Sequence, residues 1–464
     1  MRPERRDIIP AARICSSAQY LNHTASNTRR EGPVIVPRPD HNVSRSQISK
    51  NALRVLYRLK DAGYKAFLVG GGVRDLLLGR EPKDFDIVTD ALPEEVRRLF
   101  RNSRLIGRRF RLAHVHFGRE IIEVATFRAA RDAEPEQDRD PRVDRQTDAG
   151  GRILRDNVYG DIDEDVWRRD FTCNALYYNI ADFSIWDYAG GVQDILDGTI
   201  RLLGEPEARY REDPVRMLRA VRFAAKLGFR FDPATEAPLL TLGDLLDEVP
   251  AARLFDESLK LFLSGHAVQS YELLRHYGLF GFLFPSTDEE LDREHNESFR
   301  ALVLKALENT DERVASGQPV TPMFLLGVFL WQPAVNLAER LRESGDAPMQ
   351  AMIEAADTVL RAQQQYVSIP RRFGTPMREM MSMQLRMRNQ HGRRALRMLE
   401  HPRFRAAFDF LRLRVAAGDE QADVFEFWER LESMDDEHRR SAVSPKRGER
   451  SRRRRPRRRK KKSS

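Results

Sequence analysis

The chain has 464 residues, of which 41% are hydrophobic and 32% charged, and its formal net charge is +9. This length is too great for one ordinary core, so we expect two or more packed units. The two cysteines, Cys15 and Cys173, exclude a disulfide framework and show no zinc-ligand spacing. The N-terminus lacks the apolar core of a secretory signal, and a reducing, cytoplasmic location is therefore expected.

The positive charge is concentrated near the C-terminus. Residues 445–464 carry a net charge of +12, which leaves −3 for the rest of the chain, and residues 361–414 carry +10 through thirteen arginines and three acids. Such regions suit a polyanionic partner, because neutralising phosphates releases counterions. A solvated charged surface is the alternative. Residues 441–464 are too charged to bury anything and are predicted to be disordered.

In chain order, the predicted elements form a small α/β head. Residues 1–45 are polar and are predicted to be a flexible lead-in. A helix is predicted from residue 51 to near Gly63. Residues 131–157 are predicted to be a mobile loop. Between these two segments the pattern predicts strands at 67–69, 85–88, 112–117 and 121–126 and helices at 73–78 and 93–100.

An all-helical body is predicted to follow. Strand signals stop after about residue 205, and helical spacing takes over at residues 210–227, 254–263 and 270–277. Residues 323–331 are apolar but too few to span a membrane, so they are predicted to be a buried helix. The expected fold class is therefore α+β, with a mixed-sheet head and a helical body.

The strongest chemical signal joins a glycine run to two carboxylates. Residues 70–75 read Gly-Gly-Gly-Val-Arg-Asp, and Asp84 and Asp86 follow in the next predicted strand. Side chains two positions apart in a strand share a face, so these carboxylates are expected side by side. That pairing suits two Mg²⁺ ions in phosphoryl transfer. A surface Asp-x-Asp after an ordinary glycine turn is the alternative.

The glycine run itself suggests a phosphate site. It lies between a predicted strand and a helix start, where backbone N–H groups of Gly71 and Gly72 could hold a triphosphate and Arg74 could add positive charge. The chain contains no Gly-Lys dipeptide, which excludes a P-loop. The run also lacks the third glycine of a dinucleotide fingerprint.

A basic helix is predicted between Asp213-Pro214 and Gly228, which have the residue types of a helix start and a helix end. Four cations recur along it at three- and four-residue steps: Arg216, Arg219, Arg222 and Lys226. An amphipathic helix with a solvated basic edge is the alternative.

Together these motifs resemble the class II nucleotidyltransferases, the family of CCA-adding enzymes and bacterial poly(A) polymerases. The resemblance is carried by the glycine run with its two aspartates, by residues 168–175 (Arg-Arg-Asp-Phe-Thr-Cys-Asn-Ala) and by residues 212–216 (Glu-Asp-Pro-Val-Arg). It implies a flexible segment at 1–45, a nucleotidyltransferase head at 46–200, a nucleotide-recognition neck at 201–265, an RNA-binding body at 266–440 and a basic tail at 441–464.

The resemblance implies catalytic roles for three carboxylates. Asp84 and Asp86 would hold the Mg²⁺ ions and prime the RNA 3′-hydroxyl, and Asp170 would belong to the same site. From the residue types alone, Asp170 is expected to be a carboxylate at a helix N-terminus, where it offsets the dipole of that helix. Glu123, on a strand expected beside Asp84, is a further candidate that would support a metal or an arginine.

The resemblance also implies nucleotide-binding roles. Arg169 and Asn174 would contact the ribose, and Asp213 and Arg216 would read the base edge without a template. An arginine fork and a carboxylate suit that task, because together they can satisfy a base edge.

Residues 105–115 resemble the stretch found in bacterial poly(A) polymerases. Residues 253–260 and the basic tail point the same way, so the resemblance favours a poly(A) polymerase over a CCA-adding enzyme. We therefore expect template-independent transfer of AMP from ATP to RNA 3′ ends, mainly of mRNA and small RNAs, with release of pyrophosphate. A CCA-adding enzyme and a non-catalytic RNA-binding protein on this fold are the alternatives. Arginine suits phosphate recognition, and an RNA track is suggested by Arg371, Arg372, Arg386, Arg388, Arg393, Arg394 and Arg397.

Overall fold

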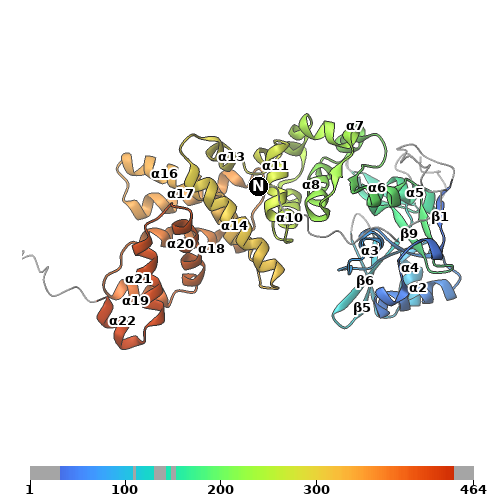
Figure 1. Cartoon of the computed structure of the whole chain (residues 1–464), viewed down its shortest axis with the longest axis horizontal. Coiled ribbons are helices and arrows are strands. Elements are labelled where there is room, and N and C mark those ends of the chain that lie inside the picture. Colours follow the sequence, from blue (N-terminus) through green and yellow to red (C-terminus); the bar gives the residue numbers. More distant parts are fainter. Residues whose placement is uncertain (1–31, 108–110, 130–142, 148–152, 444–464) are drawn as a thin grey trace, which may run out of the picture. The chain divides into compact units, whose positions relative to one another are not determined.

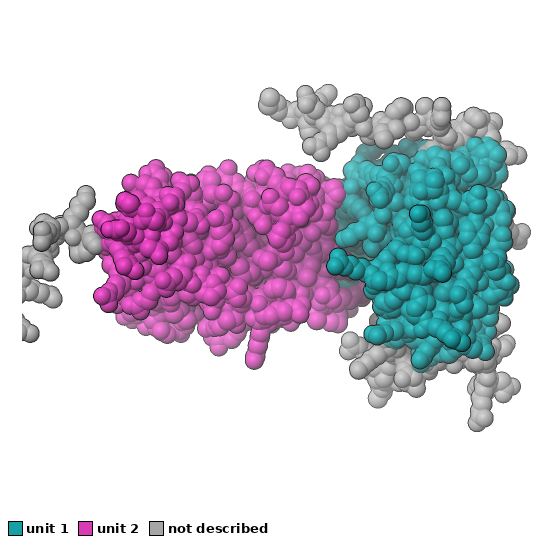
Figure 2. Space-filling model, turned by 90° about the horizontal axis from the view of Figure 1, so that it is seen from below, with its two compact units in different colours: residues 1–246 teal, residues 247–464 magenta. Residues whose placement is uncertain are grey.

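The computed structural model describes residues 32–107, 111–129, 143–147 and 153–443. The chain divides into two compact units, residues 1–246 and 247–464 (Figure 2). The first unit contains the predicted head and most of the predicted neck. Residues 247–265, which were expected to complete the neck, belong to the second unit.

The first unit is built on an eight-stranded mixed sheet with the order β1-β10-β9-β2-β3-β6-β5-β4. Only β3 and β6 pair in parallel, and every other neighbouring pair in this sheet is antiparallel. The strands are β1 (Val34–Val36), β2 (Ala66–Val69), β3 (Asp86–Thr89), β4 (Ser103–Ile106), β5 (Leu112–Phe117), β6 (Glu120–Thr126), β9 (Leu176–Asn179) and β10 (Ile185–Asp187).

Helices cover this sheet (Figure 1). Helix α2 (Lys50–Asp61) contacts β2, β3 and β6, and α4 (Pro93–Leu99) contacts β4, β5 and β6. Val69 and Asp86 are paired across β2 and β3, so the Asp86 side chain lies on the same face as Phe67 and Val88. That face packs against Val166 of α5 (Ile162–Trp167) in one hydrophobic cluster. The remaining helices of the unit are α3 (Gly71–Leu77), α6 (Gly191–Asp197), α7 (Pro206–Glu212), α8 (Val215–Leu227) and α9 (Pro233–Glu236).

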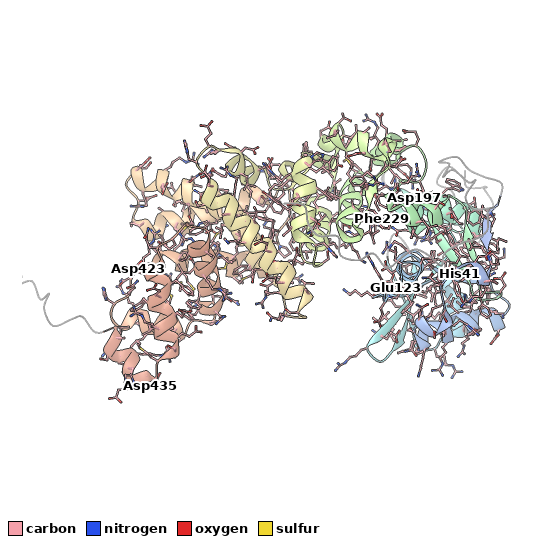
Figure 3. All side chains as sticks on the ribbon, in the orientation of Figure 1. His41, Glu123, Asp197, Phe229, Asp423 and Asp435 are labelled. Carbon is pink, nitrogen blue, oxygen red and sulfur yellow. The ribbon has the colours of Figure 1, made fainter. Side chains whose placement is uncertain are left out.

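The prediction of a flexible lead-in over residues 1–45 is wrong from residue 32 onward. Strand β1 pairs with β10 at the edge of the sheet. His41 (Figure 3) is buried, and its Nε2 lies 2.9 Å from the carbonyl oxygen of Phe183. Three apolar residues, Val34, Ile35 and Val36, are enough to add an edge strand once a partner strand is present. Residues 1–31 lie outside the described part of the chain.

The prediction of a mobile loop over residues 131–157 is also wrong in part. Strands β7 (Val143–Thr147) and β8 (Ile153–Val158) form an antiparallel pair of their own. The remaining residues of that segment, 131–142 and 148–152, are outside the described ranges. The rule that strands stop after residue 205 has one exception, because β12 (Arg230–Phe231) pairs with β11 (Thr199–Ile200).

The helix predicted over residues 210–227 is two helices. Helix α7 ends at Glu212 and α8 begins at Val215, so Asp213 and Pro214 form the connection and Pro214 takes the N-cap position expected for Asp213. Proline disfavours helical geometry in the residue before it, which explains the break. Gly228 ends α8 with a φ of 73°, as predicted.

The second unit is helical in its described residues, and none of the described helices is long and apolar enough to cross a membrane. The predicted buried helix at 323–331 is confirmed as α15. Its Phe329 packs against Phe262, Phe280 and Phe284, with ring centroids 5.0–5.6 Å away. The helices are α10 (Ala251–Phe262), α11 (Ala267–His276), α12 (Phe280–Leu283), α13 (Pro285–Asp292), α14 (Glu297–Ala315), α15 (Pro322–Phe329), α16 (Trp331–Glu343), α17 (Pro348–Gln363), α18 (Arg371–Met387), α19 (Gly392–Leu399), α20 (Phe404–Ala416), α21 (Ala422–Ser433) and α22 (Asp436–Ala442).

Candidate active site

The glycine turn connects β2 to α3 and lies against the segment that carries the aspartates. Gly70 has φ 73° and ψ −139°, a conformation open to glycine and strained for other residues. A Cβ added to Gly72 would lie 3.4 Å from the carbonyl oxygen of Asp84. The turn therefore packs directly against the residues before β3.

Asp86 is the first residue of β3, and Asp84 lies in the connection before that strand. Strand alternation, the reason given for placing these two carboxylates together, therefore does not apply to Asp84. Both residues are exposed. Asp86 is instead the direct neighbour of Glu123 (Figure 3) across the parallel pair β3–β6.

Three charges act on Asp86. Its surroundings raise the pKa of its carboxyl group to about 6, first through desolvation and then through the negative charges of Glu123 and Asp84, while the positive charge of Arg169 opposes them. The negative charges of Asp84, Asp86 and Glu123 repel one another, and a bound cation would relieve that repulsion.

His114 lies beside this group, on β5. Its Nε2 is 3.0 Å from Oε1 of Glu123. This partner orients the Glu123 carboxylate at the strand position next to Asp86. Residues 108–110 of the segment 105–115 are outside the described residues.

Arg169 is held beside the glycine turn by two partners. Its Nε donates to the Tyr177 hydroxyl at 2.7 Å, and its Nη2 donates to Asp165 at 2.8 Å. Its Nη1 would lie 3.9 Å from a Cβ on Gly70. A half-buried, anchored guanidinium next to the glycine turn and Asp86 is suited to an anionic ligand. The sequence indicated Arg169 but not the supporting Tyr177 and Asp165.

The predicted residues Arg74, Asn174 and Asp170 form a connected chain of hydrogen bonds. Nη1 of Arg74 donates to Oδ1 of Asn174 at 2.5 Å. Nδ2 of Asn174 donates to Oδ1 of Asp170 at 3.4 Å. The second guanidinium edge of Arg74 donates to Asp75 at 2.7 and 2.9 Å. Arg74 is therefore turned toward residues 165–175 and is 1% exposed.

Asp170 also pairs with Arg219 of α8, a residue recognised in the sequence only as part of a basic stripe. Nε of Arg219 donates to Oδ2 of Asp170 at 2.7 Å, and Nη2 contacts the same oxygen. Burial opposes the ionisation of Asp170, but Arg219, the Phe171 N–H and Asn174 together hold its pKa below the usual value. Both carboxylate oxygens of Asp170 thus accept hydrogen bonds from protein donors.

The basic stripe of α8 is not a solvated edge. Arg219, Arg222 and Lys226 are half-buried. The guanidinium carbons of Arg74 and Arg219 lie 5.4 and 5.5 Å from the ring centroid of Phe223. The stripe therefore faces the head, where it adds positive charge around the predicted site.

The predicted base-reading residues lie at the connection between α7 and α8. Arg216 is 6% exposed, and its Nη1 donates to Glu212 at 2.5 Å and to the Arg209 carbonyl oxygen at 2.8 Å. Arg209 in turn donates to the carbonyl oxygen of Arg169 at 2.6 Å. Asp213 is half-buried in the same connection. The structure thus links the Asp213–Arg216 segment to Arg169.

Among the described residues, no group of three or more His, Cys, Asp or Glu side chains is arranged to hold a metal ion. Two carboxylates still fit Mg²⁺, because this ion keeps several waters and commonly takes one or two carboxylates together with substrate phosphates. Asp84 and Asp86, with Glu123 adjacent, supply such a donor set.

Similarity to known proteins shows the family to which the chain belongs. Three family models match: the poly A polymerase head domain at residues 66–201, a segment described as a probable RNA and SrmB-binding site of polymerase A at 228–291, and the polymerase A arginine-rich C-terminus at 344–462. The chain is 51% identical over 381 residues to poly(A) polymerase I of Salmonella typhi, which covers 82% of this chain and 81% of that one. The chain belongs to the poly(A) polymerase family.

This membership makes the chain a nucleotidyltransferase and confirms the resemblance that its motifs indicated. A CCA-adding enzyme of Lactobacillus helveticus is 38% identical over 226 residues, which cover 48% of this chain and 52% of that enzyme. The structure of the Thermotoga maritima CCA-adding enzyme complexed with tRNA matches with a TM-score of 0.52 and 21% identity, over 84% of each chain. That likeness supports the α+β fold with a mixed-sheet head and helical body.

Proposed function

We propose that this enzyme adds AMP units from ATP to RNA 3′ ends without a template and releases pyrophosphate. The observation that carries the proposal is the convergence of the glycine turn, Asp84, Asp86 and Arg169 in a chain similar to poly(A) polymerase I over 82% of its length. We expect the RNA substrates to be mainly mRNA and small RNAs, and we expect the reaction to occur in the cytoplasm.

Asp84 and Asp86 are the proposed ligands of Mg²⁺, with Glu123 as a supporting carboxylate. Bound there, the metal would neutralise phosphate charge and lower the pKa of the 3′-hydroxyl. The chain's own contribution is positional, because the backbone at Gly72 lies against Asp84 and the backbone at Gly70 lies beside Arg169 and Asn174. His114 holds Glu123 next to Asp86.

The nucleotide is proposed to lie along the glycine turn. Backbone N–H groups of Gly71 and Gly72, in the first turn of α3, have no preceding helical turn to bond to and can face the triphosphate. Arg169 is placed to add charge on the same side. Arg74 is proposed to act on the nucleotide indirectly, because its guanidinium holds Asn174, the proposed ribose contact.

Asp170 and Arg216 are proposed to set the position of the nucleotide. Asp170 ties α8 to the head through Arg219, and Asn174 shares that carboxylate. Arg216 and Asp213 are proposed to read the adenine edge. In the described structure Arg216 is held by Glu212, so base recognition would use its remaining donors or an exchange of that partner.

Poly(A) addition is favoured over CCA addition by the extent of the similarity. The CCA-adding relative covers 48% of the chain, whereas poly(A) polymerase I covers 82% and the arginine-rich C-terminal model matches residues 344–462. A non-catalytic role is disfavoured because Asp84 and Asp86 are both present beside an intact glycine turn.

The test is to incubate one RNA with each NTP separately in Mg²⁺ and to size the products. A long ladder with ATP alone supports poly(A) addition. Addition of only one or two nucleotides with CTP alone, and no ladder with ATP alone, would establish the CCA reaction instead. No product with any NTP, from a folded protein that binds RNA, would favour the non-catalytic role.

A further inference from the structure

A pocket of about 310 Å³ opens in the helical body, and none of its lining residues belongs to the site described above. Helices α14, α15 and α20 form it together with the segments before α15 and α20. Its apolar part includes Val320, Met323 and the half-buried ring of Phe324. The volume lies at the lower end of the range of ligand pockets, about 300–1,000 Å³.

The charged residues of this pocket are strongly unbalanced. Four arginines line it, Arg313 from α14, Arg403 before α20, and Arg405 and Arg412 on α20, against a single carboxylate, Asp409. The lining thus carries a net charge of three positive units. An anion is the ligand that such a lining favours.

Two of these arginines have their charge balanced within the protein. Arg405 pairs with Asp409 at 3.0 Å and lies 3.5 Å from Glu432. Arg403 pairs with Glu379 at 3.4 Å. The positive charges of Arg403 and Arg405 are therefore largely neutralised by carboxylates of the protein.

The other two are not balanced by any described carboxylate. Arg313 donates to the carbonyl oxygen of Pro319 at 2.9 Å, which holds its guanidinium at the pocket but leaves its charge uncompensated. Arg412 is exposed, and it forms no ion pair with the described residues. Arg313 and Arg412, neither of them paired with a described carboxylate, thus line the same pocket as the apolar residues.

A second pocket of the body, about 300 Å³, shows the contrast. Its buried Arg414 is paired with Asp419 at 2.5 Å, and its Arg388 is paired with Glu420 at 2.9 Å. Two of its three arginines are thus neutralised by pairing, and with Arg342 against Glu339 the lining has a net charge of only one positive unit, which gives less reason to expect an anion.

We propose that the pocket between α14, α15 and α20 binds one nucleotide of a single-stranded RNA, with its phosphate at Arg313 and Arg412 and its base against Phe324. Proteins that bind single-stranded RNA combine cations along the backbone with apolar and aromatic surfaces for the bases. This inference rests on the proposed function, because it assigns a second contact to the same RNA substrate.

Binding is measured first, without ATP and with EDTA, so that catalysis does not enter. A fluorescent single-stranded RNA is titrated with the full chain and with Arg412→Gln and Phe324→Leu variants across salt concentrations. Loss of one phosphate contact lowers the slope of log K against log salt by about 0.7. Loss of base stacking weakens binding by about fivefold or more. Arg340→Gln, which removes an exposed arginine of the same unit outside the pocket, is the control.

The thermal unfolding midpoint of each variant is measured beside the titrations. If Phe324→Leu is destabilised, the conclusion rests on Arg412→Gln alone. The proposal is overturned if Arg412→Gln binds RNA with the same affinity and salt slope as the parent, or changes them no more than Arg340→Gln does. It is also overturned if inorganic phosphate or a polyglutamate peptide binds the parent more tightly than Arg412→Gln while RNA binds both proteins equally. Those results would identify a general anion site or an acidic protein partner.

A 4-thiouridine-containing RNA gives the location independently. Crosslinks are expected at residues 319–325 or 402–412, and crosslinks confined to other segments would contradict the assignment. Failure of the proposed function appears separately, as an absence of nucleotide addition in a protein whose RNA titrations still report on the pocket.

Discussion

The carboxylate of Asp170 accepts a hydrogen bond from Nε of Arg219 at 2.7 Å, and the two residues are separated by 49 positions in the chain. The same carboxylate holds Asn174, which holds Arg74 in α3, just after the glycine turn. One side chain thus ties helix α8 to the elements around the glycine turn. We infer that Asp170 is chiefly a positioning residue.

Asp170→Asn is expected to lower the free energy of unfolding by roughly 2–4 kcal/mol, because it leaves the half-buried Arg219 charge without its partner. Arg219→Gln in the same background should restore part of that loss, since the unpaired charge is then removed. Urea unfolding of the two single variants and the double variant measures the coupling. Strictly additive losses would show that the pair contributes nothing.

The stabilisation from Asp170 should depend on pH in a defined direction. Its pKa is lower in the folded state, so its contribution is fully present above the unfolded value of about 3.9 and is lost as pH falls through the folded pKa. The difference in unfolding free energy between the parent and Asp170→Asn should therefore be constant from pH 5 to 8 and shrink only in stronger acid. A difference that grew on acidification would contradict the direction of the shift.

Asp84→Ala and Asp86→Ala are each expected to reduce nucleotide addition by several orders of magnitude, because phosphoryl transfer depends on metal positioning and charge. Both residues are exposed, so the thermal unfolding midpoint should change little. Single-turnover rates in Mg²⁺ measure the loss, and Glu81→Gln, an exposed acid in the same connection, is the matched control. Near-normal turnover of either aspartate variant would refute the metal-ligand assignment.

Arg216→Gln is expected to change nucleotide choice, either through misincorporation or through a specific loss of ATP use. Rates for the four NTPs are compared as ratios within one preparation, which cancels any loss of folded protein from disturbing the buried Glu212 contact. Arg211→Gln, an exposed arginine paired with Glu207 on α7, controls for charge. Unchanged ratios for Arg216→Gln would remove it from base recognition.

Removal of residues 445–464 deletes a net charge of +12 and is expected to weaken RNA binding and flatten the dependence of log K on log salt. The rate on saturating RNA should barely change, because Asp84, Asp86 and Asp170 all lie in the first unit. Filter binding across salt concentrations, beside single-turnover rates, measures both. An unchanged salt slope would rule out an RNA tether, and a collapsed rate would show that the tail acts at the catalytic site.

Short-range patterns in the sequence determined the local elements of the head and the residue types of the site. Helix α2, strands β2, β3, β5 and β6, and the Gly228 cap were all predicted close to their observed bounds. These features depend on hydrophobic period and on the backbone freedom of glycine, which act within a few residues. The glycine run and the Asp-x-Asp motif were recognisable for the same reason.

Which residues distant in the sequence come into contact depends on the tertiary structure alone. Strand β1 exists because β10 offers it a partner 151 positions later, at the register Val34–Asp187, Ile35–Trp186 and Val36–Ile185. Glu123 stands beside Asp86 because β6 pairs in parallel with β3, and Arg219 meets Asp170 because α8 packs on the head. Hydrogen bonds and charge pairs between distant segments are chosen by how the elements pack, and no local pattern encodes that choice.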